Sequence, residues 1–248
     1  KMKKATSLFI ILVAALALSA CNVNLQIGNN EVITGSGNVV TREIEVSDFD
    51  AVRLAGVGEL SITQGETESL TIEAEDNILD VLESNVRAGE LVLGTRQGVT
   101  ITPTRPIRYT LTVKDLSALE LSGLGNASMD GLTTGRLELS ISGSGNLELK
   151  NVQAEDVRAT IDGLGSVEIS GTAKSLDARL NGSGNFKAGD LAVKAANVRI
   201  DGLGSATVWA ADTLDVNIGG AGNLDYYGSP SVTQKISGLG HVDNRGAK

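Results

Sequence analysis

Few residues of this chain could do acid–base or nucleophilic chemistry, and they are scattered. His241 is the sole histidine, and because imidazole titrates near neutral pH it is the natural candidate for a general base. No sequence motif around it completes a Ser-His-Asp arrangement. The sequence therefore predicts no catalytic residues.

Carboxylates recur at one position of a repeated phrase, where they could offer oxygen ligands to a hard cation such as calcium. Asp162 and Asp201 occupy that position two repeats apart, with Asn181 between them. The segment Gly219–Asp225 is also similar to a calcium-binding β-roll repeat, but its aspartate comes one place late and the repeat period is wrong. Because nothing completes a coordination shell, we expect no metal and no cofactor.

Trp209 and Tyr227 are the side chains best suited to contact a ligand, since aromatic rings line many binding sites. Both fall off the inward register set by their neighbours Val208 and Tyr226. We therefore expect them to be exposed near the C-terminal end of the fold, as a ligand contact or as stray surface aromatics.

These residues are positioned by a phrase that occurs nine times: an aliphatic residue, one further residue, Gly-x-Gly, and then usually a small polar residue. Apolar residues alternate on both sides of each Gly-x-Gly, which is the pattern of a strand, a tight bend and a second strand, each with one buried face. From Gly123 onward the spacing is 18 to 20 residues. The first glycines are Gly35, Gly56, Gly123, Gly143, Gly163, Gly182, Gly202, Gly220 and Gly238.

Identical turns at a fixed spacing, with crossovers too short for helices, predict successive coils. We expect an all-β fold over residues 31–248: a single-stranded, right-handed parallel β-helix (a solenoid) with coils of roughly 18–20 residues. At one coil per repeat length this gives about ten or eleven coils. Residues 64–114 lack Gly-x-Gly and are expected to form irregular coils or a cap, with a short helix over residues 76–82 and a hairpin turning at Ala88-Gly89.

Three features of the repeat suggest how the coils stack. The glycines would allow positive φ at the bend and close approach of the next coil. The asparagine that often follows the second glycine suits turn chemistry and could form a ladder between coils, with a row of polar groups for a glycan as the alternative. The residue between the glycines alternates between leucine and a small residue from Leu124 to Leu239, which suggests leucines that pack over small neighbours.

The first twenty residues have the pattern of a processing signal. Lys1, Lys3 and Lys4 precede an apolar run over residues 8–18, which is too short to span a bilayer but suits a secretory signal peptide. The run ends Leu-Ser-Ala-Cys, which resembles the lipobox of bacterial lipoproteins and implies lipidation at Cys21. We thus expect a signal peptide over residues 1–20, a tether over residues 21–30 and anchoring to a membrane by acyl chains.

The composition and net charge of the chain exclude some classes of binding partner. The content of 41% hydrophobic and 21% charged residues is that of a folded chain. The formal net charge of -9 would fall to about -12 without the three leader lysines, and an acidic surface does not suit nucleic acid or anionic lipid. We expect no nucleic-acid partner.

The residues together resemble one known family. The lipoprotein leader, the Gly-[Ser/Leu]-Gly-[Asn/Ser] turns and the segment Glu75–Leu82, which reads E-D-N-I-L-D-V-L, are similar to the head-GIN domain family. That family is labelled as an autotransporter adhesin head and is otherwise of unknown function. The resemblance covers about residues 40 to 240, implies a parallel β-helix in the bacterial envelope, and carries no catalytic residues to this chain.

The sequence thus favours a lipid-anchored cell-envelope β-helix that serves as an adhesion or binding module for a glycan or a partner protein, and not an enzyme. Two alternatives stay open: a structural or envelope-stress-related spacer without a ligand, and a polysaccharide-active enzyme, since polysaccharide lyases also use parallel β-helices. Because Asn22 is not the aspartate that retains lipoproteins in the inner membrane of enteric bacteria, we expect the outer membrane, with the domain facing either the periplasm or the cell surface.

Overall fold

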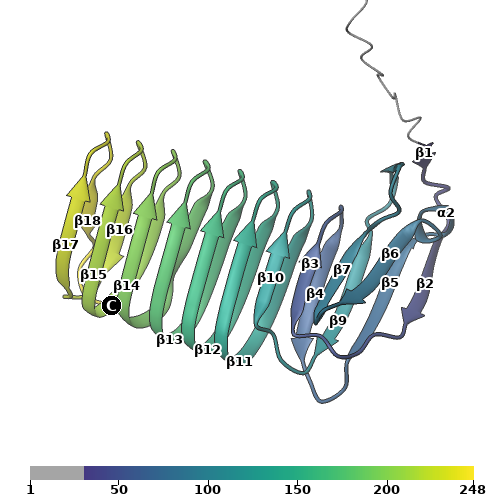
Figure 1. Ribbon diagram of the computed structural model, residues 1–248, viewed down its shortest axis with the longest axis horizontal. Coiled ribbons are helices and arrows are strands. Elements are labelled where there is room, and N and C mark those ends of the chain that lie inside the picture. The colour runs from purple at the N-terminus through teal and green to yellow at the C-terminus, as the bar shows by residue number, and fades with distance from the viewer. Residues whose placement is uncertain (1–30) are drawn as a thin grey trace, which may run out of the picture. The chain divides into compact units, whose positions relative to one another are not determined.

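The repeated part of the chain forms long strands that each run from one Gly-x-Gly corner to the next (Figure 1). The computed structural model describes residues 31–248. Equivalent residues are parallel partners in successive coils, as where Ala127 pairs with Leu147 and Leu147 pairs with Val167. The predicted stack of parallel coils is confirmed. The long strands are β11 (Asn126–Ile141), β12 (Asn146–Ile161), β13 (Ser166–Leu180), β14 (Asn185–Ile200) and β15 (Ala206–Ile218).

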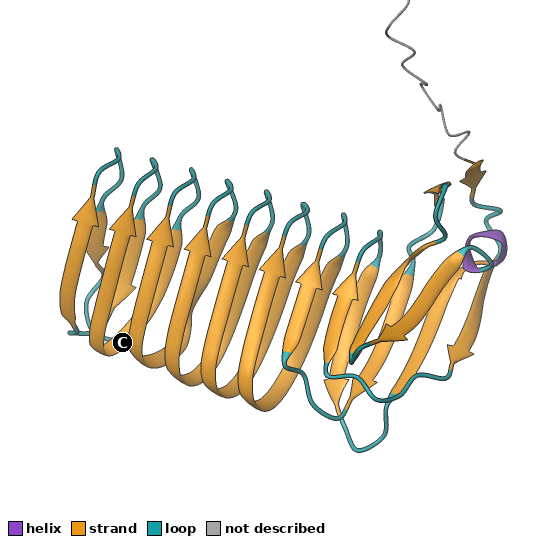
Figure 2. Cartoon of the chain, in the orientation of Figure 1, coloured by secondary structure: helices purple, strands orange, loops and turns teal. Residues whose placement is uncertain are grey.

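Each long strand bends midway, so that its two halves lie on opposite faces of the stack (Figure 2). We call the face made by the first halves the post-glycine face and the face made by the second halves the pre-glycine face. The post-glycine face is extended by β4 (Glu59–Gln64), β16 (Leu224–Tyr227) and β18 (Val242–Asn244). The pre-glycine face is extended by β3 (Ala51–Leu54), β10 (Ala118–Leu121) and β17 (Ser231–Ile236).

The core is the row of inward side chains between the two faces, because alternation places every second residue of each half-strand inside. The position two residues before the first glycine is almost fully buried from Leu54 to Ile218. The outermost copies differ: Ile33 is half-buried and Ile236 is 39% exposed. These two lie at the ends of the fold, where an aliphatic residue has a neighbour on one side only.

The expectation of ten or eleven coils is wrong, and the stack has about 6 turns. Residues 57–122 do not form successive coils between the corners at Gly56 and Gly123. Instead β3 pairs directly with β10, with Leu54 opposite Leu121, so these two corners are neighbours in the stack. The intervening chain runs out to the N-terminal end and returns.

That N-terminal end is built from strands that join both faces. β7 (Glu90–Thr95) continues the pre-glycine face beside β3, and β9 (Arg108–Val113) continues the post-glycine face beside β4. Antiparallel partners then complete each face. They are β5 (Ser69–Glu75) beside β9, β2 (Val39–Ile44) beside β5, and β6 (Leu82–Arg87) beside β7.

The predicted hairpin is confirmed, because β6 and β7 turn at Ala88 and Gly89 with φ of 50 and 82°. The helix is shorter than expected: α2 spans Asp76–Leu79, and its N-cap position is Glu75. The copy of the phrase at Gly35 forms no coil. Its β1 (Glu31–Thr34) pairs with β8 (Val99–Thr102), while β2 runs antiparallel to β5.

Close stacking explains the corner glycines, and the expectation of positive φ is wrong for most of them. Of the glycines that open or close a Gly-x-Gly corner, Gly37 and Gly58 alone have positive φ within residues 31–248. A Cβ on Gly163 would lie 1.9 Å from the carbonyl oxygen of Gly143 in the preceding coil. The glycines thus allow neighbouring corners to approach until backbone meets backbone.

The asparagines form the expected contacts between coils. The Asn126 side-chain oxygen accepts hydrogen bonds from the backbone N–H of Asn146 at 3.0 Å and from its side-chain amide at 3.1 Å. Asn146 in turn accepts the N–H of Ser166 at 3.2 Å. Because these oxygens satisfy turn backbone of the next coil, the structural interpretation of the asparagines holds.

The leucines between the glycines do not pack over their small neighbours, contrary to expectation. Leu124 and Leu203 are each 68% exposed, Leu164 is 70% exposed and Leu239 is 90% exposed. The corner turns so sharply that its middle side chain is exposed to solvent.

Residues 31–248 contain no helix that is long and apolar enough to cross a membrane. The predicted signal peptide (residues 1–20), the predicted lipidation site Cys21 and the whole of the predicted tether (residues 21–30) lie outside the described residues.

Candidate functional site

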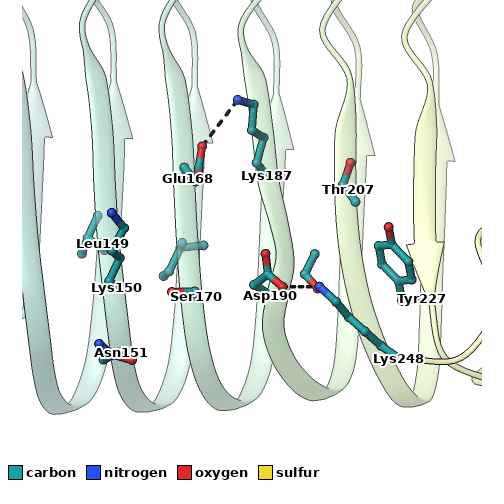
Figure 3. A pocket seen from close by; sticks show the side chains of 12 residues that line it. Leu149, Lys150, Asn151, Glu168, Ser170, Lys187, Asp190, Thr207, Tyr227 and Lys248 are labelled. Carbon is teal, nitrogen blue, oxygen red and sulfur yellow. Dashed lines mark hydrogen bonds and ion pairs between the residues drawn. The ribbon is translucent and has the colours of Figure 1, made fainter.

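A hollow lies on the post-glycine face toward the C-terminal end of the stack (Figure 3). Its volume is about 550 Å³. Strands β12 to β16 form its floor, and lysines from three separate parts of the chain reach into it. The lining residues are Leu149, Lys150, Asn151, Glu168, Ile169, Ser170, Lys187, Gly189, Asp190, Thr207, Tyr227 and Lys248.

The hollow exists because β14 carries extra residues here. Between its partnered positions opposite Glu168 and Ser170, β14 has two residues where β13 has one. On its other side, Ala188 and Ala192 of β14 pair with the adjacent Val208 and Trp209 of β15. Asp190 keeps its partner Ser170 in β13 but has no partner in β15, and bulges commonly redirect a side chain in this way.

Gly189 lets an aromatic ring approach this irregular stretch. A Cβ at this position would lie 3.0 Å from the Thr207 methyl group and 3.3 Å from the Tyr227 ring. A larger residue would push Tyr227 away, so the glycine helps to set the width of the hollow.

Three ammonium groups and their carboxylate partners set the electrostatics of the hollow. Lys187 Nζ lies 3.4 Å from Glu168 Oε2, and Lys150 Nζ lies 2.5 Å from Glu148 Oε1. The hydrogen bond and charge of Glu148 raise the pKa of the Lys150 ammonium. The third ammonium, Lys248, donates to Asp190 and to the carbonyl oxygen of Gly189.

The two aromatic residues that the sequence singles out come together here. Trp209 and Tyr227 are direct partners on β15 and β16, and both are half-buried, where the sequence predicted exposed side chains. The Lys248 ammonium lies 4.9 Å from the centroid of the Tyr227 ring and 5.9 Å from that of Trp209, within the range of cation–π attraction. Tyr227 lines the hollow, while Trp209 supports it from the neighbouring strand.

The sequence analysis missed the charged residues of the hollow. Lys150, Lys187 and Lys248 are ordinary surface lysines in a linear sequence, and their convergence depends on the stacking register. Gly189-Asp190 gives no signal either, because Asp130-Gly131 and Lys150-Asn151 interrupt the alternation at the same position of their repeats.

The other residues considered for chemistry do not meet at one site. Asp162 accepts a hydrogen bond from Asn181 at 2.6 Å, and Asp201 pairs with Arg199 at 2.6 Å. His241 is exposed and lies 3.2 Å from Asp243. Within residues 31–248, no three His, Cys, Asp or Glu side chains gather as metal ligands.

The pKa of Glu75 is lowered, and the hydrogen bonds of its carboxylate explain why. Its carboxylate accepts hydrogen bonds from the Thr104 hydroxyl at 2.5 Å and from the backbone N–H groups of Thr104, Gly37 and Arg105 at 2.8, 2.6 and 3.3 Å. These bonds, the Thr104 hydroxyl first, lower the pKa of Glu75. Because the carboxylate ties three segments of the N-terminal end together, a role in folding accounts for it.

The neighbouring Asp76 holds the same segments. It accepts hydrogen bonds from the Ser36 hydroxyl at 2.5 Å and from the Asn38 amide at 2.9 Å, and both lower its pKa. The E-D-N segment on which the family resemblance rests therefore fastens the first Gly-x-Gly copy to the N-terminal end of the stack.

Comparisons with known proteins agree with this architecture. The profile of a family described as "putative auto-transporter adhesin, head GIN domain" matches residues 48–230. No curated protein matches the chain. The chain is also similar to solved structures of bacterial proteins.

A crystal structure of a putative adhesin from Bacteroides fragilis is 27% identical, with a TM-score of 0.82, and the match covers 86% of this chain and 99% of that one. Two crystal structures from Parabacteroides distasonis are each 26% identical over 86% of this chain. One is described as a putative adhesin (TM-score 0.68, 100% of that chain) and the other as a putative lipid binding protein (TM-score 0.72, 99% of that chain).

Proposed function

The chain belongs to the auto-transporter adhesin head GIN domain family, and from that premise we propose that it is a lipid-anchored binding module of the cell envelope that holds a glycan in the hollow. The observation that carries the proposal is the convergence of an aromatic pair and three lysines on a concave part of an otherwise regular sheet. A sugar ring can pack on an aromatic face, while charged groups bind its polar substituents.

Acidic sugars are the first class to test. Each of the three lysines of the hollow pairs with a carboxylate, Glu148, Glu168 or Asp190, so these charges balance, whereas the whole chain has a net charge of -9. A place where cations balance the acids repels an anionic ligand less than the rest of an acidic surface does. The Lys248 ammonium now rests on the Tyr227 ring, so a sugar carboxylate could pair with it while the sugar ring contacts the aromatic edge.

A glycan array that includes uronic and sialic acids tests this proposal. We expect binding that Tyr227→Ala and Trp209→Ala weaken and that high salt weakens further. Lys187→Ala has a matched control in Lys174→Ala, because each lysine pairs with a glutamate one coil earlier but Lys187 alone lines the hollow. Loss of binding in both lysine variants, or in neither, would contradict a site in the hollow.

The membrane anchor rests on the leader sequence and needs its own test. We propose that acyl chains on Cys21 hold the domain at the outer membrane, with the domain facing the periplasm or the cell surface. Metabolic labelling with a fatty acid should mark the chain, and Cys21→Ser should abolish the label. Protease treatment of intact cells then distinguishes the two orientations.

Other ligands are outcomes of the same experiments. If the array shows no glycan bound but a partner protein binds and Tyr227→Ala abolishes that binding, the hollow is a protein-binding site. If nothing binds, the spacer alternative gains support. Release of products from an acidic polysaccharide, lost in His241→Ala, would instead support an enzyme.

A further inference from the structure

The row of exposed corner leucines forms a regular apolar ridge along one edge of the stack. We call Leu124, Leu164, Leu203 and Leu239 the leucine ridge, and each is more than two-thirds exposed. Small residues fill the corners between them: Ser144, Ser183 and Ala221, all exposed. A row of large exposed apolar side chains commonly marks an interaction surface.

The ridge is held rigidly. The backbone N–H of Leu164 donates to the carbonyl oxygen of Gly143 at 3.1 Å, and that of Leu203 donates to Gly182 at 3.0 Å. The same bond recurs at the other ridge corners, and the glycine contacts leave no room for the corners to shift. Because coils repeat at about 4.8 Å, successive leucines stand about 10 Å apart with a gap one coil wide between them.

We propose that the leucine ridge is a self-association surface, on which a second copy of this chain binds with its coils in the opposite direction and the two ridges interdigitate. A two-fold axis perpendicular to the stack reverses the coil order, so it can set leucines of one copy against small corners of the other. A two-fold axis along the stack would instead set leucine against leucine. The closed, isologous arrangement is therefore the antiparallel one.

One register sets three of the four leucines against small corners. It sets Leu164 opposite Ser183 of the second copy, Leu203 opposite Ser144, and Leu124 opposite Ala221. By the same symmetry, each of the three small corners receives a leucine. A slip of one coil would bring leucines together, so the alternation in the sequence excludes the two adjacent registers.

The charges beside the ridge fit this register. The antiparallel axis keeps the pre-glycine faces of both copies on the same side. Asp162 then lies opposite Asn181 of the second copy, and Asp201 lies opposite Ser142. Both aspartates therefore meet groups that can donate hydrogen bonds, and no two like charges face each other in these rows.

The same observations favour a second copy over a bilayer. A lipid surface would accept leucine at every corner, and nothing about it requires a small residue at alternate corners. Two aspartates flank the ridge, and the chain is acidic overall, which opposes approach to anionic lipid. The three engaged leucines, with about 100 Å² each of apolar surface, give roughly 300 Å² per copy, which is below the size of a standard specific interface. We therefore expect a weak, concentration-dependent dimer.

Sedimentation equilibrium of the whole chain carrying Cys21→Ser, over a wide range of concentrations, tests the proposal. We expect Leu164→Ser with Leu203→Ser to weaken the dimer at least about tenfold. Val32→Ser is a matched control, because Val32 is an aliphatic residue that is 65% exposed and lies off the ridge. A monomer at all concentrations, or equal dimers in the ridge variant and the wild type, would overturn the proposal.

Ser183→Leu distinguishes interdigitation of the two ridges from non-specific hydrophobic association. It adds apolar surface but fills a gap, so interdigitation predicts a weaker dimer, whereas non-specific association predicts a stronger one. Binding of vesicles of neutral phosphatidylcholine that increases in Ser183→Leu would overturn the proposal in favour of a membrane surface. Circular dichroism should be unchanged in every variant, since all of these side chains are exposed.

Disulfide trapping then checks the register. On the Cys21→Ser background, chains with Leu164→Cys mixed with chains with Ser183→Cys should form a mixed disulfide rapidly. Leu164→Cys mixed with Ser144→Cys is the control, because those corners are not opposite in the proposed register. Equal trapping in both mixtures would refute the antiparallel register.

Discussion

The substitution Gly163→Ala tests whether the corners are glycine because neighbouring coils touch or because the bend needs an unusual backbone. Gly163 does not have positive φ, so alanine can adopt its conformation. The new Cβ would, however, lie 1.9 Å from the carbonyl oxygen of Gly143, 2.9 Å from its carbonyl carbon and 3.0 Å from the carbonyl oxygen of Ser142. An ordinary contact needs about 3.5–4.0 Å, so the two corners must separate by well over an ångström.

The expected cost follows from these contacts. Overpacking in a tight site typically costs about 1–3 kcal/mol. The obstructed oxygen of Gly143 also accepts the Leu164 N–H at 3.1 Å, and losing that hydrogen bond adds about 0.5–1.5 kcal/mol. We therefore expect Gly163→Ala to lower the free energy of unfolding by about 3 kcal/mol, measured by urea denaturation followed by circular dichroism.

The chain supplies a matched control at the same position of another corner. Gly56 is also the first glycine of a Gly-x-Gly without positive φ, but a Cβ there would meet nothing closer than the Gly94 Cα at 3.7 Å. Gly56→Ala should thus be neutral, or stabilising by about 0.4–1 kcal/mol because it restricts the unfolded chain. Equal effects of the two substitutions would refute the stacking explanation.

Three further perturbations address the core, the asparagines and the N-terminal end. Phe186→Ala removes a fully buried ring and should cost about 3–5 kcal/mol in urea denaturation. Asn126→Ala removes the acceptor of the Asn146 N–H and should cost about 0.5–1.5 kcal/mol without changing glycan binding, whereas lost binding at unchanged stability would favour the polar-row interpretation. Glu75 has a lowered pKa in the folded chain, so its contribution is complete above its unfolded pKa of about 4.3 and is lost as the pH falls through the folded pKa. Glu75→Gln should therefore flatten the loss of stability below about pH 4.3, and an unchanged acid profile would contradict this linkage.

The coils could be predicted from sequence because each repeat obeys the same two local rules. Alternation places residues such as Leu147 and Val167 inside, and the Gly-x-Gly spacing sets the length of the turn. The parallel pairing of Ala127 with Leu147 then follows, because equivalent residues one repeat apart must stack. The hairpin at Ala88-Gly89 could be predicted in the same way, because it depends only on the residues of its own turn and strands.

The N-terminal end could not be counted as coils, because its order in space differs from its order in sequence. The direct pairing of Leu54 with Leu121 depends on the chain between them leaving the stack and returning. The exposure of Leu164 also differs from the prediction. The alternation of leucine and small residues between the corner glycines suggests that the leucines pack over the small residues, which they do not. An outward side chain at a sharp corner has no neighbour to pack on, whatever its type.

Stacking determines where function can reside in such a fold. Inward side chains are buried in the core, and the backbone groups of the corners are hydrogen-bonded to the neighbouring coils. A ligand can therefore contact only outward side chains. A regular coil presents those side chains in flat rows, which hold a small ligand poorly. The irregular stretch at Gly189-Asp190 breaks the rows on one face and creates a concave place, while the residues between the corner glycines project beyond the stack at its edge. At both places side chains stand clear of the flat rows, and they are the places where we expect binding.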